Sequence, residues 1–384
     1  MIKSNKTMFF WATFVLLLIP LITGVAFAGV LNSAQNSIVV TRVPDAALDK
    51  TIKDIAIENF HKYIEPLREK VTQVDVGLNY QTLTNGNVVA VADVNFKHVL
   101  NFAKVEDNPL IKGKLQYLQD NPRISAAYQS YIKKDIEDWT SELNKHINNQ
   151  YPGFLRLKIS ATLDDKGTIN SNSIKVLVED PIGEFVQADN YFKPTTDAEA
   201  EKAGYDSINN AVNALSLRAN AAVVIPMDPP TPRYARSLAT SYIETYTSNP
   251  TIPCRTGSST VQDNTKYNSA YQWYQCNDCA NYVSQALKKG AIPTSSSWQP
   301  YTTDWINVNG LISYMTTNYY WSQSSRTAIQ NGDPITITSS STTHTTMCDY
   351  SNGAGYVEVC GHTNDQQYHS YPGESGVTYW HVVY

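Results

Sequence analysis

The sequence predicts an α+β protein, and two observations carry this prediction. In the first half of the chain, apolar residues alternate in strand-like segments around turn signals, between stretches with helical spacing. In the last third, the helical stretches come first and the strand-like segments follow. We expect an α+β accessory domain at residues 29–225, a proline-rich linker at 226–232 and a second domain at 233–384.

The first 28 residues have the features of an export signal. Lys3 and Lys6 precede an apolar run that ends in the small-x-small motif Ala26-Phe27-Ala28. The run is also long enough for an uncleaved membrane anchor. We favour a signal peptide cleaved after Ala28, so that the membrane is a partner only if this segment stays uncleaved. In both cases the rest of the chain is exported, either secreted or held at the cell surface.

The accessory domain begins with helical spacing over residues 45–73, and Pro66 should kink or end that helix. Strands follow at 74–83 and 88–100, around the hairpin signal Thr84-Asn85-Gly86-Asn87. Later segments predict helices at 108–120, 124–149 and 197–222, and strands at 154–163 and 174–178. This pattern, an antiparallel sheet with helices on one face, is similar to that of cystatin-like or NTF2-like adaptor domains.

The second domain should open with a helix at residues 234–247. The remaining patterns predict helices at 279–289 and 307–318, and strands at 335–338, 344–350, 355–361 and 379–384. The formal net charge of the chain is −5, and no basic patch indicates binding to nucleic acid. We expect no cofactor and no metal.

Cys279 stands at the start of the predicted helix between Asp278 and Gly290, a helix-capping and a helix-ending residue. An apolar stripe on this helix places Cys279 in the first turn, on the buried side. The unpaired N–H groups and the helix dipole there favour a thiolate, which is the nucleophile of cysteine hydrolases. The Cys279 N–H would be one oxyanion donor. Tyr274 is a further candidate donor, and Asn281 should hold the adjacent loop.

Two histidines lie in the strand-like segments that follow. If Cys348 lies opposite Cys360 in a hairpin, His344 and His362 become diagonal neighbours on one face. A helix on that face would present Cys279 to His344, the expected base, while His362 orients the imidazole of His344. A plain structural role for His362, or its replacement by the loop residue His369, remains an alternative.

The cysteine count of five is odd, which in an oxidising compartment leaves one thiol after two disulfides. We expect Cys254–Cys276 and Cys348–Cys360 bridges, with Cys279 free. A Cys276–Cys279 redox latch, a thioredoxin-like C-x-x-C motif, and a zinc site formed by His344, Cys348, Cys360 and His362 are the alternatives. Clustered aromatic residues indicate either core or a substrate groove: Trp298, Tyr301, Trp305 and Trp321.

Residues 233–384 resemble the putative amidase domain family, which is related to the NlpC/P60 peptidases of the papain-like group. The resemblance lies in Asp278-Cys279-x-Asn281-Tyr282-Val283-Ser284-Gln285, in Gly332-Asp333, in His344 and in Gly361-His362-Thr363-Asn364-Asp365. It implies a papain-like fold, with Cys279 as nucleophile, His344 as base and His362 as third member of the triad. Residues 338–343 depart from the family's usual acidic, glycine-rich loop before the strand histidine.

Two functions are therefore expected from this sequence. The first is an exported cysteine amidase or peptidase that cleaves a peptide or another amide, with peptidoglycan as a candidate substrate. Its reaction would pass through a thioester on Cys279. The second is an inactive secreted binding or adhesion module that retains the fold and binds through its tyrosine-rich surface.

Overall fold

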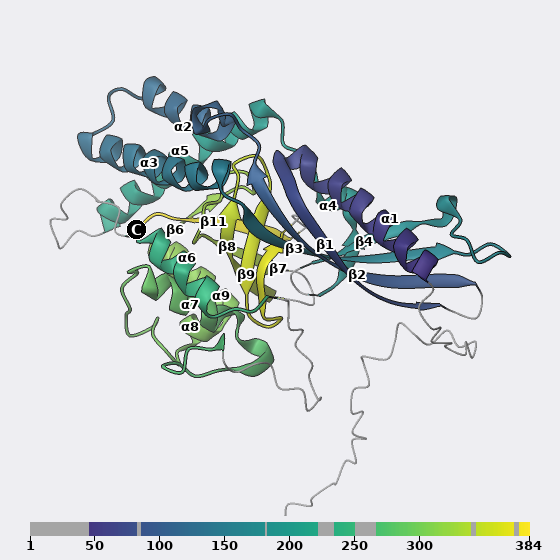
Figure 1. Ribbon diagram of the computed structural model, residues 1–384. Coiled ribbons are helices and arrows are strands. Elements are labelled where there is room, and N and C mark those ends of the chain that lie inside the picture. The colour runs from purple at the N-terminus through teal and green to yellow at the C-terminus, as the bar shows by residue number, and fades with distance from the viewer. Residues whose placement is uncertain are drawn as a thin grey trace, which may run out of the picture. The chain divides into compact units, whose positions relative to one another are not determined.

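The computed structural model describes residues 46–82, 86–180, 183–221, 234–249, 266–338, 343–371 and 376–384. The helices are α1 (Ala46–Ile64), α2 (Pro109–Asp120), α3 (Ala126–Asn148), α4 (Ala188–Tyr191), α5 (Asp197–Ala221), α6 (Arg236–Thr245), α7 (Cys279–Lys289), α8 (Thr303–Ile306) and α9 (Val308–Thr317). The strands are β1 (Glu69–Thr82), β2 (Asn87–Leu100), β3 (Tyr151–Thr162), β4 (Lys175–Glu179), β5 (Phe185–Gln187), β6 (Trp321–Ser324), β7 (Pro334–Thr338), β8 (Thr343–Ser351), β9 (Val357–Gly361), β10 (Gln366–Ser370) and β11 (Val377–Val382). The predicted α+β class is confirmed (Figure 1).

Most predicted elements are present, and two differences have clear causes. The first helix was expected to reach residue 73, but it ends at Ile64, because Pro66 lies in a 3₁₀ turn and Arg68 follows with φ of 65°. Residues from Glu69 onward therefore belong to β1. The segment around His369, interpreted as a loop, is β10, which pairs with β9.

One sheet joins strands from both halves of the chain. Its order is β1-β2-β3-β10-β9-β8-β7-β11-β6, with β4 paired to β3 and β5 paired to β4. Most neighbours are antiparallel, whereas β10 meets β3 in parallel at His369 and Phe154. The predicted linker at 226–232 lies outside the described residues, so the predicted domain boundaries stay a prediction, as does the signal in residues 1–28.

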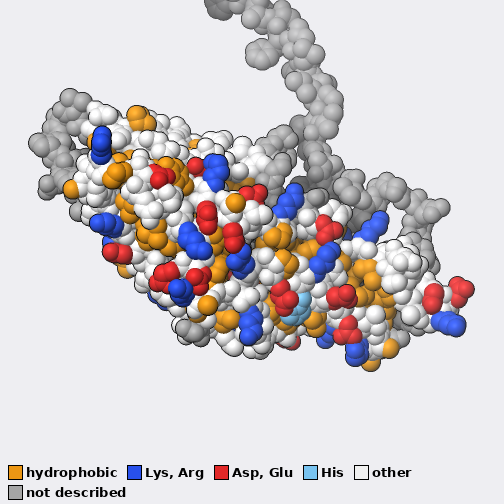
Figure 2. Space-filling view, turned by 90° about the horizontal axis from the view of Figure 1, so that it is seen from above, with side chains coloured by type: hydrophobic (Ala, Val, Ile, Leu, Met, Phe, Trp, Pro, Cys, Tyr) orange, Lys and Arg blue, Asp and Glu red, His pale blue; other side chains and the backbone are white. Residues whose placement is uncertain are grey.

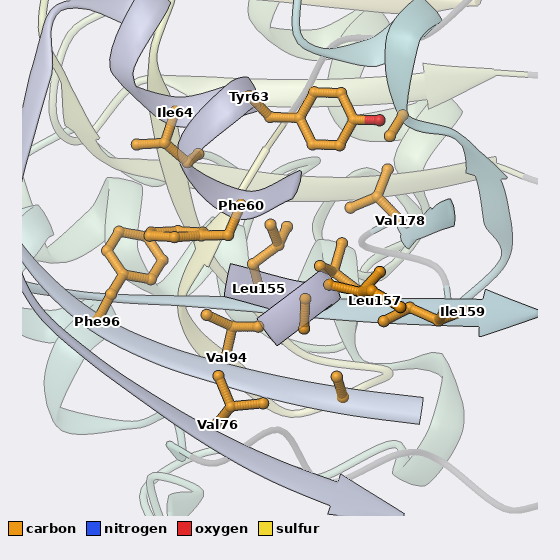
Figure 3. Packing of buried hydrophobic residues seen from close by; sticks show 14 of the residues in the cluster. Phe60, Tyr63, Ile64, Val76, Val94, Phe96, Leu155, Leu157, Ile159 and Val178 are labelled. Atoms are coloured by element: carbon orange, nitrogen blue, oxygen red, sulfur yellow. The ribbon is translucent and has the colours of Figure 1, made fainter. Parts of the chain in front are cut away.

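The accessory half is held by α1 against the sheet of β1, β2 and β3. Phe60 and Ile64 point from α1 into a cluster with Val94, Phe96 and Leu155, as Figure 3 shows. In β2 the burial alternates along the strand, as the period-2 sequence pattern predicts. Burial of this apolar face stabilises the fold at roughly 25 cal/mol per Å² of apolar surface.

A buried ionic network joins this half to β9. The His98 imidazole of β2 contacts Glu69 through Nδ1 at 2.7 Å and Glu358 through Nε2 at 3.0 Å. Tyr350 and Tyr356 donate their hydroxyl hydrogens to the same two carboxylates. The two glutamates raise the pKa of His98 to about 10 against the opposing effect of burial, so the ring carries its charge at neutral pH.

Close helix packing gives the first testable prediction. Gly113 of α2 and Gly204 of α5 allow these helices to touch, since a Cβ on Gly113 would lie 1.8 Å from the Glu201 carbonyl oxygen. That backbone oxygen cannot rotate away, so Gly113→Ala should lower the free energy of unfolding by about 1–3 kcal/mol or more. Denaturant unfolding measures this change. Gly77→Ala is the control, because its Cβ would meet atoms only at 3.8 Å; equal stability of the two variants would contradict the prediction.

The face seen in Figure 2 carries charges of both signs, interspersed with one another. Several helices of the described residues carry exposed ion pairs one turn apart: Lys50–Asp54, Lys134–Asp138 and Lys202–Asp206. Such exposed pairs each contribute little to stability. Within the described residues, none of the helices has the length and apolar character needed to span a bilayer.

Candidate active site

Cys279 is the first residue of α7, and the helix ends at Lys289 with Gly290 as its C-cap, as predicted. The predicted apolar stripe is buried: Tyr282, Val283, Ala286 and Leu287. It packs α7 onto β8 and β9. The Cys279 side chain is a free thiol and is 8% exposed, so the sulfur lies at the edge of the core.

The Asp278 side chain holds the segment before α7 and does not cap the helix itself. One carboxylate oxygen accepts from the Tyr274 N–H at 3.1 Å and from Asn281 Nδ2 at 2.8 Å. Asn281 Nδ2 also donates to the Gln272 carbonyl, and its oxygen accepts from Trp305 Nε1 at 2.8 Å. The expected loop-holding role of Asn281 is confirmed, whereas the expected capping hydrogen bond from Asp278 is not formed.

Three donors surround the Cys279 sulfur: the N–H groups of Ala280 and Thr345 and the Thr363 hydroxyl. Each of them lowers the pKa of the thiol. Burial has the larger, opposite effect, and the net pKa of Cys279 is raised above its ordinary value. The expectation of a resting thiolate is therefore wrong: in this structure the nucleophile candidate is a neutral thiol with donors already in place for its ionised form.

The pairing of β8 with β9 differs from the predicted register by one residue. Cys360 lies opposite Met347 and Cys348 opposite Val359, because Asp349 is an extra residue in β8. Side chains alternate along a strand, so Cys348 and Cys360 lie on opposite faces, and both are free thiols. The predicted Cys348–Cys360 disulfide is wrong. The Cys254–Cys276 pairing stays a prediction, since Cys254 lies outside the described residues.

The same register separates the two histidines. Thr345 shares its face with Met347, which α7 covers, so His344 lies on the other face, opposite Ile337 of β7. The imidazole is 3% exposed, and its Nε2 is buried with no hydrogen-bond partner among the described residues. Burial lowers the pKa of His344 to about 4, so the ring is neutral at pH 7 and keeps one nitrogen available.

His362 lies beside α7, and its ring contacts Asp278 and the backbone of Tyr246. Its Nδ1 contacts the second carboxylate oxygen of Asp278 at 2.7 Å, and its Nε2 contacts the Tyr246 carbonyl at 2.6 Å. The ring stacks on Tyr282 at 4.1 Å. The carboxylate and the carbonyl are both hydrogen-bond acceptors, so each ring nitrogen of His362 faces an acceptor. The predicted contact in which His362 orients His344 is therefore replaced by a contact with Asp278.

The structure also decides among the other sequence hypotheses. Trp298 and Trp305 are fully buried and Trp321 is 3% exposed, which confirms them as core, whereas Tyr301 is 68% exposed. A zinc set that includes both Cys348 and Cys360 is incompatible with their opposite faces. Because Cys279 is free, no Cys276–Cys279 latch is formed.

The residues that sequence reasoning missed around the sulfur are Thr345 and Thr363, and the missed partner of His362 is Asp278. Each stands directly beside a residue that the sequence singled out: Thr345 after His344, Thr363 after His362, and Asp278 before Cys279. That adjacency was the available signal. It gave no indication of which atoms would meet.

Residues 233–382 match the putative amidase domain family. The chain is also 44% identical over 50 residues to the uncharacterized protein YjcM of Bacillus subtilis (strain 168). That alignment covers 13% of this chain and 12% of the relative. No solved structure matches. The family assignment indicates amide hydrolysis at a general level.

Proposed function

We propose that this protein is a cysteine hydrolase that cleaves amide bonds. The premise is that residues 233–382 belong to the putative amidase domain family. The observation that supports the proposal most is the Cys279 sulfur at the start of α7, with two N–H groups and one hydroxyl directed at it. Such donors stabilise a thiolate once a base has removed the proton.

In the proposed reaction His344 is the base. Its neutral imidazole removes the thiol proton as the sulfur attacks the amide carbonyl, and the Cys279 N–H stabilises the oxyanion. The imidazolium then protonates the departing amine, which leaves a thioester on Cys279. Water, activated by the neutral imidazole, hydrolyses the thioester. Since the His344 ring lies on the far face of β8, the proposal requires the first residues of β8 to turn when substrate binds.

The pH dependence tests this assignment of acid and base. The reaction needs a neutral His344, with a pKa of about 4, and a thiol whose pKa is raised. We expect kcat/KM to stay level between about pH 5 and 8 and to fall toward acid near pH 4. Steady-state kinetics on fluorogenic aminoacyl amides measures this profile. An acid limb near pH 6 or 7 would instead indicate a base with an ordinary imidazole pKa and would contradict the assignment of a buried, neutral His344 to this role.

We propose that His362 positions Asp278, and through it the start of α7. His362→Ala removes both ring contacts, so we expect kcat to fall about 10- to 100-fold with KM nearly unchanged. His362→Gln, which retains one amide donor, should restore part of kcat. His61→Ala is the control, because His61 is partly exposed on α1 and its ion pair is with Glu65, away from Asp278 and α7. If His362→Ala instead raises KM by about 10- to 100-fold and leaves kcat unchanged, His362 acts in substrate binding.

We also propose export, with cell-wall peptides as the substrate class, on the basis of the signal-like residues 1–28. The mass of the protein isolated from its host distinguishes a cleaved signal from an anchor. Soluble peptidoglycan fragments and simple aminoacyl amides, compared as substrates, test the wall assignment.

A non-catalytic binding module is the second candidate. The observation that favours it is the His344 ring on the face of β8 that α7 does not cover. The two candidates differ in whether any amide is turned over and whether an acyl group appears on Cys279 in intact-protein mass spectra.

A further inference from the structure

The turn between β9 and β10 has an unusual backbone conformation at Thr363. The φ of this residue is 95°, in the left-handed region that favours glycine and that a β-branched residue rarely adopts. Within the part of the chain that the structure describes, no other β-branched residue has a φ in this region. Glycine or asparagine would form the same turn with less strain, so it is the threonine side chain that calls for an explanation.

Contacts on both sides of Thr363 hold the turn in place. On one side, the His362 ring is fixed by Asp278 at the start of α7. On the other, an Asp365 carboxylate oxygen accepts from the Ser248 N–H at 2.8 Å. The strands β9 and β10, which pair with each other, close the turn. Backbone strain persists where surrounding contacts fix it in this way, and it concentrates at functional sites.

The Thr363 side chain meets the sulfur of Cys279 with chemistry that its neighbours lack. Two of the three donors at the sulfur are the backbone N–H groups of Ala280 and Thr345, which can only donate. The Thr363 hydroxyl can donate and accept, and it changes between the two by rotation about its C–O bond. A resting thiol needs an acceptor for its hydrogen, whereas a thiolate needs donors. Only the hydroxyl serves both states.

We propose that Thr363 is a catalytic residue, whose hydroxyl accepts the Cys279 S–H at rest and donates to the thiolate once the base has removed the proton. Thr363 keeps its own hydrogen throughout, and the thiol proton passes to the base. A hydrogen bond to an ionised acceptor is stronger than one between neutral groups, so the exchange favours ionisation. The strained turn holds the hydroxyl at the sulfur. This role rests on the proposed function of Cys279 as the nucleophile.

Thr363→Val and Thr363→Ser test the hydroxyl. Valine keeps the shape and the branch at Cβ but cannot form the hydrogen bond, whereas serine keeps the hydroxyl. The measurement is the rate of iodoacetamide labelling at Cys279 against pH, read by mass spectrometry of the peptide that contains this residue. We expect the midpoint of the profile to move up by about 1 in pH for Thr363→Val and to stay in place for Thr363→Ser. An unchanged midpoint in Thr363→Val would overturn the proposal.

Turnover of aminoacyl amides by the same variants separates this proposal from the proposed hydrolysis. We expect Thr363→Val to lower kcat about 10-fold with KM nearly unchanged, and Thr363→Ser to stay within about 3-fold of the wild type. Hydrolysis by a wild type whose labelling midpoint does not respond to Thr363→Val would leave the reaction standing without this residue. A raised midpoint in a protein that cleaves no amide would overturn the reaction and leave only the contact with the thiolate.

Thr363→Gly and Thr363→Ala test the strain. Both remove the hydroxyl and the methyl group, and they differ in the Cβ that a left-handed φ disfavours. We expect Thr363→Gly to unfold about 1–3 °C above Thr363→Ala, the reverse of the usual order. Ala291→Gly is the matched control. Its φ is 75° at the far end of α7, so it should raise the unfolding midpoint and leave the labelling profile unchanged. If Thr363→Ala is more stable than Thr363→Gly, the turn is not strained and the proposed means of holding the hydroxyl is wrong.

Discussion

Cys279→Ser is expected to abolish amide hydrolysis, with a fall in kcat of at least about 1,000-fold and no change in the thermal unfolding midpoint. Serine nearly preserves the size of the side chain, so the three donors keep their places. The hydroxyl, however, is a far weaker nucleophile than a thiol in a site arranged for sulfur. The measurement is turnover of aminoacyl amides, together with intact-protein mass spectra that report an acyl group on the wild-type enzyme alone.

Cys348→Ser is the matched control for this substitution. Cys348 is also a free buried thiol, and it donates to the Tyr350 carbonyl at 3.4 Å, a bond that serine can keep. It faces the core cluster on the other side of the sheet from α7, so its replacement should leave kcat within about 2-fold. If Cys279→Ser and Cys348→Ser retain the same activity, the hydrolytic reaction does not use Cys279. That result would support the binding-module hypothesis.

The helix that carries Cys279 could be predicted to the residue because its signals are local. The apolar stripe, Asp278 at its start and Gly290 at its end all act within a few residues of one another. The β1–β2 hairpin was likewise predicted from local alternation around its turn, except for residues 69–73 of β1, which were expected to be helical. Where neighbours along the chain determine the structure, the sequence pattern was sufficient.

The relation between the histidines could not be predicted because it depends on one extra residue. Side chains along a strand alternate between the two faces of the sheet. The extra residue Asp349 therefore shifts the β8–β9 register by one, so that the residues before it meet β9 with the opposite alternation to the residues after it. Nothing in the alternation of residues 343–351 reveals which residue is the extra one. The expected Cys348–Cys360 bridge and the shared face of His344 and His362 both depended on a register without it.

Long-range partners were a second source of error. Asp278 was expected to cap the helix that follows it, yet its carboxylate meets His362, 84 positions away in the sequence. The polar segment Gln366-Gln367-Tyr368-His369-Ser370 has no apolar alternation, and it forms β10 because β9 and β3 lie on either side of it. Tertiary pairing overrides local propensity in such segments.

His98→Ala is expected to cause the largest loss of stability in the chain. The change removes the cation between Glu69 and Glu358, whose side chains are both completely buried. The two buried carboxylates then keep only the neutral donors Tyr350 and Tyr356 and have no cation between them, which costs about 3–5 kcal/mol of the free energy of unfolding. Denaturant unfolding at pH 7 measures the loss. His61→Ala is the matched control, since it removes the same side chain from an exposed pair and should cost less than about 1 kcal/mol.

The pH dependence of stability separates this ionic role from simple packing. The pKa of His98 is about 10 in the folded protein, above the ordinary value of 6.5 expected in the unfolded chain. The folded state therefore holds its proton more tightly, and the stabilisation is complete below about pH 6.5 and is lost as the pH rises toward 10. We expect the wild-type free energy of unfolding to decrease over this range and the His98→Ala variant to lack that part of the decrease. Parallel curves for the two proteins would mean that His98 stabilises the sheet by filling space, with no contribution from its charge.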